Sequence, residues 1–240
     1  MEQNNNHSLK ILTYNVSWQS MTGLTSNWDF CNTTLDDLDN RHYSKCIQGV
    51  TTMIDENGPF DFIALQEASN YELIIDDSEC LKKMNHLVHK SSREFMVTFW
   101  NPLHKLIMDI KGNFQKGRPW HALIFKDICF VNIHAGHYSM EILGKKLAHM
   151  ISSIKKHLTN QRIIMAGDFN FPINKYYSTI ILSKIQFHLS ERYFNTLTNF
   201  KGKRGIQFDH IIDSKRAPDE IYIPDVSEMA SDHLPVIAVL

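Results

Sequence analysis

The sequence has no long hydrophobic run. No stretch approaches the roughly 18 consecutive apolar residues that a membrane-spanning helix needs. The first residues, Met1 to His7, are polar and lack a basic segment followed by an apolar one, so no secretory signal is expected. These absences predict a soluble protein without stable membrane association, located inside the cell in the cytoplasm or nucleus.

Closely spaced cysteine pairs are also absent. The four cysteines, at positions 31, 46, 80 and 129, are scattered along the chain. This spacing argues against a disulfide framework and against a structural zinc knuckle. We therefore expect all four to be reduced thiols in the core or at the surface.

The chain carries almost no net charge. Its formal charge is −1, so the counts of charged residues do not indicate a broad cationic face that would bind duplex nucleic acid. Basic residues gather locally in two groups, Lys201, Lys203 and Arg204, and more loosely Lys111, Lys116 and Arg118. Basic residues in loops are most often solvated turns, but the placement of these groups makes them candidates for contact with a substrate phosphate.

Internal repeats, low-complexity segments and Pro/Gly/Ser-rich linkers are missing as well, so nothing divides the chain. A length of 240 residues is within the range of a single two-sheet domain, and 43% hydrophobic residues are enough for a large core. We predict a short polar N-terminal segment at 1–8 and one domain at 9–240, acting as a monomer.

Short apolar runs predict a chain rich in strands. These lie at about 9–16, 61–66, 94–100, 105–111, 121–126, 128–134, 162–166, 206–212 and 234–239. Two apolar stripes at helical spacing lie between them, one at Ile47, Val50, Met53 and Ile54, the other at Ile142, Leu143, Leu147, Met150, Ile151, Ile154 and Leu158. Strands and helices alternate unevenly, which favours an α/β fold of two packed mixed sheets flanked by helices over one parallel sheet.

Polar residues of catalytic type flank the apolar runs. They are Asn15, Glu67, His134, Asp168 with Asn170, Asp209 with His210, and the closing Ser231-Asp232-His233. Six such sites beside strands predict one shared active site.

In this order and with these neighbours, the segments resemble the endonuclease/exonuclease/phosphatase superfamily, which has the deoxyribonuclease I-like fold. The resemblance extends from Tyr14-Asn15 to Ser231-Asp232-His233. It implies a four-layer sandwich of two packed mixed β-sheets flanked by helices, with the active site at one edge. It also implies metal-dependent hydrolysis of phosphate esters.

The resemblance assigns metal binding to three residues. Glu67, the glutamate of the Gln66-Glu67 pair, corresponds to the principal metal ligand, with Asn15 nearby. Asp232 corresponds to a second metal-site carboxylate. Carboxylate oxygens suit Mg²⁺, which we expect as the cofactor, with Mn²⁺ as a substitute.

The resemblance assigns the catalytic steps to a second set of residues. Asp168 resembles the carboxylate that orients the attacking water, and Asn170 an amide that contacts phosphate. Asp209 corresponds to the aspartate that pairs with the terminal histidine, His233. His134 matches a phosphate-donating histidine that deoxyribonuclease I, sphingomyelinases, deadenylases, protein–DNA adduct phosphodiesterases and inositol phosphatases carry.

Substrate-binding residues are less defined by sequence. Arg118 is a candidate for phosphate binding, because a guanidinium group donates two hydrogen bonds at once to phosphate oxygens. Trp120 either stacks on a base or is a buried core residue. His137 has no family counterpart, and we predict it as a pocket-lining residue.

These residues predict an Mg²⁺-dependent phosphodiesterase acting on nucleic acid, as a nuclease or end-processing enzyme, or on a nucleotide. One alternative is a phosphatase acting on a phosphorylated lipid, inositol or other small molecule. The inositol 5-phosphatase pattern is not kept, since the segment 205–210 retains only its aspartate, Asp209. A second alternative is a catalytically silent binding module.

Overall fold

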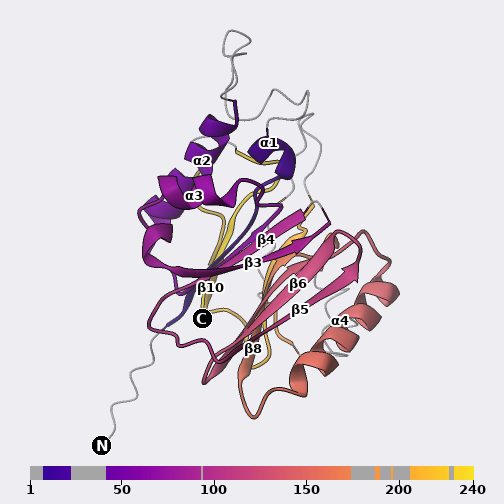
Figure 1. Ribbon diagram of the computed structural model, residues 1–240. Helices are drawn as coiled ribbons and strands as arrows, with labels where there is room; N and C mark the ends of the chain where they lie inside the picture. Colours follow the sequence, from indigo (N-terminus) through magenta and orange to yellow (C-terminus); the bar gives the residue numbers. More distant parts are fainter. Residues whose placement is uncertain are drawn as a thin grey trace, which may run out of the picture.

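The structure is a computed structural model, and it describes residues 8–22, 42–92, 94–173, 187–189, 196, 206–226 and 230–240. Two mixed sheets form its centre (Figure 1). The first has the strand order β10-β11-β1-β2-β4-β3, and the second has the order β5-β6-β7-β8-β9. The predicted architecture of two packed mixed sheets with helices is confirmed.

The strands of the first sheet are β1 (Lys10–Asn15), β2 (Phe62–Gln66), β3 (Asn85–Ser91), β4 (Glu94–Trp100), β10 (Glu220–Tyr222) and β11 (Val236–Val239). Those of the second are β5 (Met108–Gln115), β6 (Arg118–Ile124), β7 (Ile128–His134), β8 (Arg162–Asp168) and β9 (Asp209–Asp213). The helices are α1 (Trp18–Thr22), α2 (His42–Asn57), α3 (Tyr71–Asp77), the 3₁₀ turn η3 (Leu81–Lys83) and α4 (Met140–Lys155).

The core has three layers, one between the sheets and one outside each. Strand β7 shows how they arise, because its side chains alternate between the two faces of the sheet. Val131 and Ile133 pack with helix α4, whereas Phe130 packs against Phe62 of the first sheet. Helices α2 and α3 cover the outer face of the first sheet, and α4 covers that of the second (Figure 1).

A buried polar contact ties the two sheets together. The Asn132 side chain of β7 donates to the backbone carbonyls of Leu65 at 3.3 Å and Val97 at 3.0 Å. It accepts a hydrogen bond of 2.8 Å from Gln66 Nε2. Because buried amides are costly when unpaired, these bonds specify how β7 lies against the first sheet.

Several predicted elements differ from the observed ones. Strands β3 and β10 and helices α1 and α3 were not predicted, since each is short or mostly exposed. The run predicted at 105–111 is shifted, because β5 begins at Met108 and continues to Gln115. Ile142 does not belong to the buried stripe of α4, since its side chain is 47% exposed.

Among the three cysteines that the structure describes, the expectation of a reduced thiol is wrong at one, and Cys31 lies outside the described residues. Cys46 is disulfide-bonded, whereas Cys80 and Cys129 are free thiols. Sequence spacing did not reveal this bond, because it depends on which segments the fold brings together. No helix in the described part of the chain is long and apolar enough to cross a membrane.

Candidate active site

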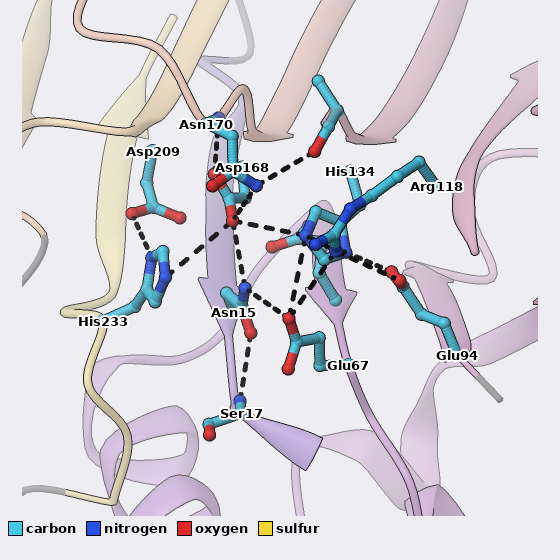
Figure 2. A network of polar contacts seen from close by, with 12 residues as sticks. Asn15, Ser17, Glu67, Glu94, Arg118, His134, Asp168, Asn170, Asp209 and His233 are labelled. Atoms are coloured by element: carbon cyan, nitrogen blue, oxygen red, sulfur yellow. Dashed lines mark hydrogen bonds and ion pairs between the residues drawn. The ribbon is translucent and has the colours of Figure 1, made fainter. Parts of the chain in front are cut away.

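Strand pairing brings most of the predicted polar residues into one network of contacts, which Figure 2 shows around Asp168. Parallel pairing of β1 with β2 places Asn15 opposite Gln66, directly before Glu67. In the second sheet, parallel pairing of β7 with β8 places His134 opposite Asp168. Antiparallel β9 adds Asp209 opposite Asp168.

The Asp168 carboxylate is the centre of this cluster. Its Oδ1 accepts the backbone N–H of Asn170 at 2.7 Å. Its Oδ2 accepts the amides of Asn170 and Asn15, each at 3.1 Å, and lies 3.4 Å from His134 Nε2 and 3.8 Å from His233 Nε2. The carboxylate is only 1% exposed, so these donors fix its orientation.

His233 is held as a cation. Its Nδ1 lies 2.8 Å from Asp209 Oδ2, and its backbone N–H donates to Ser231 Oγ at 3.1 Å. Burial alone lowers the pKa of His233, but the negative charges of Asp209 and Asp168 outweigh burial and raise this pKa to about 10. The imidazolium therefore offers its Nε2–H as a charged hydrogen-bond donor.

His134 sits in a different environment. Its Nδ1 is hydrogen-bonded to Glu94 Oε1, and its Nε2 lies 2.6 Å from Arg118 Nη1. Arginine only donates, so Nε2 accepts and Nδ1 carries the hydrogen that is donated to Glu94. Burial lowers the pKa of His134 to about 4 and raises that of Glu94 to about 8. The predicted role of His134 as a phosphate donor thus requires a protonation at Nε2 that burial opposes.

Three residues at the site have left-handed backbone conformations. Their φ angles are 59° at Ser17, 55° at Glu67 and 47° at Asn170. L side chains seldom adopt this region, and such outliers concentrate at functional sites. At Glu67 the conformation accompanies two hydrogen bonds, in which Oε1 accepts from Asn15 at 3.4 Å and Oε2 accepts from the backbone of Trp18 at 3.0 Å.

Solved structures share this arrangement of strands and helices. One is an endonuclease/exonuclease/phosphatase from Bacteroides vulgatus, with a TM-score of 0.71 and 15% identity over 97% of this chain and 98% of that one. Another is D. rerio TDP2 in complex with a single-strand DNA product, with a TM-score of 0.66 and 15% identity over 98% and 99% of the two chains. The chain has the endonuclease/exonuclease/phosphatase fold. The fold that the motif order predicted is confirmed.

This endonuclease/exonuclease/phosphatase fold also occurs in a mannosyl-6-phosphatase of Bacteroides thetaiotaomicron, with a TM-score of 0.66 and 17% identity over 97% of this chain and 100% of that one. In sequence, the chain is 30% identical over 256 residues to an uncharacterized protein of Acanthamoeba polyphaga mimivirus. The alignment covers 96% of this chain, which spans about half (50%) of that relative's length. No family model matches the sequence.

Within the endonuclease/exonuclease/phosphatase fold, Glu94 is the site residue that sequence reasoning missed. Glu94 directly precedes an apolar run and begins β4, whereas Glu67, His134 and Asp168 close or follow one. The sequence does offer a weaker signal, a carboxylate directly before the apolar run 95–100, in the same way that Asp209 stands before Ile211 and Ile212. Glu94 holds Nδ1 of His134 and lies 3.5 Å from Arg118.

The predicted substrate-binding residues have different outcomes. Arg118 is in the cluster, since its Nη1 lies 3.9 Å from Glu67 Oε1. His137 is exposed, and its described ring contact is with Phe208 at 6.2 Å rather than with the cluster. Trp120 is a buried core residue rather than a surface for stacking on a base, since it is 8% exposed and packs in the core beside α4. Lys201, Lys203 and Arg204 lie outside the described residues.

The donor set suits a divalent cation. Glu67 and Asp168 approach each other through the Asn15 amide, and Asp209 and Asp232 carry further carboxylates in the same region. Carboxylates therefore outnumber the cations that face them, which are His233 and Arg118, and hard divalent ions prefer such oxygens. As placed, Asn15 presents its amide nitrogen to Glu67 and Asp168, so a ligand role for its oxygen requires rotation of the amide by half a turn.

A second possible ligand group overlaps the first. Atoms of Asp168, Asp209 and His233 lie within 4.8 Å of one another. A metal there would have to replace the proton shared by His233 and Asp209. The hydrogen bond between His233 and Asp209 makes this group a hydrogen-bonded chain in the structure, and the role of Glu67 as the principal metal ligand stays a prediction.

Proposed function

We propose that the chain is a divalent-metal-dependent phosphoesterase that hydrolyses phosphodiester bonds in nucleic acid or in a nucleotide. The observation that carries the proposal is the buried Asp168 carboxylate, within 3.8 Å of both His134 and His233 and joined through Asn15 to Glu67. This arrangement supplies a base for water, a charged donor and a carboxylate for a metal within one cluster.

Each residue has a specific part in the proposed reaction. Asp168 Oδ2 orients the attacking water and takes its proton, since Asn15 and Asn170 hold this carboxylate in place. The His233 imidazolium donates to a phosphoryl oxygen, where negative charge grows in the transition state. Arg118 supplies a second cation on the opposite side of Asp168, next to His134.

The metal would be held by Glu67, with Asn15 and Asp232 as further ligands, as the family resemblance implies. Bound Mg²⁺ or Mn²⁺ supplies Lewis-acid stabilisation of the phosphoryl oxygens. Glu67 is suited to this role because its side chain is 16% exposed, which leaves it accessible from solvent.

The resemblance in fold to D. rerio TDP2, crystallised with a single-strand DNA product, is consistent with the proposed nucleic-acid substrate. The resemblance to a mannosyl-6-phosphatase is consistent with the second candidate, a small-molecule phosphatase. A substrate panel separates them. It contains single-stranded, duplex, abasic and 5′-adducted nucleic acids together with cyclic nucleotides, inositol phosphates and mannose 6-phosphate, each with Mg²⁺ or Mn²⁺.

We expect hydrolysis of a phosphodiester, with single-stranded or frayed nucleic acid preferred over duplex. The formal charge of −1 provides too few cations to neutralise a duplex, whereas a few local ones hold a short strand. The measurement compares cleavage of matched single-stranded and duplex oligonucleotides across a salt series. A duplex preference with a steep salt dependence would refute this substrate preference, and activity confined to phosphomonoesters would favour the phosphatase.

A further inference from the structure

A cavity of about 420 Å³ adjoins the proposed catalytic cluster. Its walls come from four places, which are helix α1, the residue that follows β2, the tip of the β3–β4 hairpin and the tip of the β5–β6 hairpin. Glu67, Glu94 and Arg118 belong both to this cavity and to the catalytic cluster. The volume is in the range of small-molecule sites, so a group attached to the scissile phosphate fits there.

One wall of the cavity is an exposed indole. Trp18 is 40% exposed, whereas the other two tryptophans in the described residues, Trp100 and Trp120, are 6% and 8% exposed. Its backbone is fixed, because its N–H donates to Glu67 Oε2 at 3.0 Å and its carbonyl accepts from Thr22 Oγ1 at 2.7 Å. An exposed indole on a backbone that is fixed beside Glu67 offers an apolar face that a flat ring would cover.

Polar and cationic groups form another part of the lining. Lys116 and Gln115 lie at the turn between β5 and β6, where Gly117 has a φ angle of 70°. Arg118 begins β6 and reaches from this turn to His134. The cavity thus combines an aromatic face with cations, the combination by which proteins hold a base and its phosphate.

We propose that Trp18 is a specificity-determining residue that stacks on the nucleobase next to the scissile phosphate, with Lys116 and Gln115 lining the rest of this base subsite. The inference rests on the proposed function and narrows its substrate to one with a base beside the phosphate. Stacking accepts every base, because each has a π face, so the subsite favours nucleotides over sugar or inositol phosphates without reading sequence.

Binding of three probes to the whole chain with Mg²⁺ tests the proposal. The probes are adenosine 5′-monophosphate, ribose 5-phosphate and inorganic phosphate, measured by titration calorimetry and checked to be intact afterwards. The proteins are the unmodified chain, Trp18→Ala, Trp18→Phe and a control, Leu103→Ala, which removes a side chain that is 82% exposed in the segment between β4 and β5.

The proposal expects the unmodified chain to bind adenosine 5′-monophosphate more tightly than ribose 5-phosphate. Trp18→Ala should weaken the adenosine 5′-monophosphate affinity by about tenfold or more and leave the two other affinities unchanged. Trp18→Phe should recover most of the loss, and Leu103→Ala should change nothing. An equal loss for all three probes, or no preference for the nucleotide, overturns the base subsite.

The failure of the base subsite is distinguishable from that of the proposed function. If the unmodified chain hydrolyses a phosphodiester and Trp18→Ala leaves nucleotide binding intact, only the base subsite is refuted. If no phosphate-bearing probe binds and no phosphate ester is hydrolysed, both proposals are refuted. Circular dichroism of Trp18→Ala shows whether a loss reflects unfolding, and Trp18→Phe then provides the test.

Discussion

Glu67 is the residue on which the proposed metal dependence rests. We expect Glu67→Gln to lower phosphodiesterase activity by at least about 100-fold, because the amide keeps the shape of the side chain but removes its negative charge. The chain should remain folded, since the variant retains the oxygen that accepts the Trp18 N–H. Initial rates at saturating Mg²⁺, with thermal unfolding as the check on folding, measure the effect. Glu141→Gln, on the exposed face of α4, is the matched control. Full activity of Glu67→Gln, or of the unmodified chain in excess chelator, would contradict the metal assignment.

The two histidines around Asp168 should act together. Replacing His134 or His233 by alanine is expected to lower turnover about 100-fold or more, and the double variant should lose less than the product of the two. Their shared contact with one Asp168 oxygen is the reason, because removing either disturbs the same carboxylate. Single-turnover kinetics of the unmodified chain, the two single variants and the double variant measures the coupling energy between the two histidines. Strictly multiplicative losses would mean that the histidines serve separate sites.

Strands β7 and β8 pair closely at Gly167, where there is no room for a side chain. An added Cβ would lie 2.0 Å from the backbone oxygen of Ile133, and the φ angle of 151° is also unfavourable for other residues. Gly167→Ala should therefore lower the free energy of unfolding by about 3 kcal/mol or more. Gly144→Ala is the control in helix α4, where a Cβ meets nothing within 4 Å, and it should raise stability by about 0.5–1 kcal/mol. Urea denaturation measures the free energy of unfolding of both variants. Equal stability of the two variants would disprove the crowding at Gly167.

The elements differ in how far sequence predicts them. Strand β7 was predicted from end to end because all seven of its residues are buried, which leaves a continuous apolar run. Strand β3 was missed, since five of its seven residues, Asn85, His86, Leu87, Val88 and Lys90, are exposed or half-buried. The positions of Asn15, His134 and Asp168 could be predicted because each closes a buried strand, and that of Glu67 because it directly follows one. Glu94, Trp18 and the bond at Cys46 depend on contacts between distant segments, which periodicity does not encode.

At the scale of the whole molecule, acid should destabilise the fold through buried neutral histidines. Burial lowers the pKa values of His121 and His210 from 6.5 to about 4. The unfolded chain therefore takes up protons near pH 6.5 that the folded chain resists until about pH 4. The stabilising contribution of each neutral histidine is fully present above pH 6.5 and is lost as the pH decreases toward 4. The free energy of unfolding falls by on the order of 3 kcal/mol for each histidine over this range.

Urea denaturation at pH 7 and pH 5 with a chelator present measures this loss. His121→Gln should show a smaller decrease between the two pH values than the unmodified chain, because one titrating group is gone. His149→Gln, at an exposed position on α4, should leave the decrease unchanged. An equal decrease in all three proteins would show that His121 does not contribute to the acid sensitivity.

Antiparallel pairing of β1 with β11 has a consequence for how the molecule acquires activity during translation. Strand β1 lies between β2 and β11, so the C-terminal strand completes the neighbourhood of Asn15, and Ser231 Oγ donates to the Asn15 carbonyl at 2.7 Å. The ribosome delivers His233 after every other proposed catalytic group. A nascent chain that stalls before residue 230 contains Glu67, His134 and Asp168 but not the imidazolium opposite them. Under the proposed function, we therefore expect partial translation products that stop before residue 230 to have much lower activity than chains that include β11 and the segment 231–233.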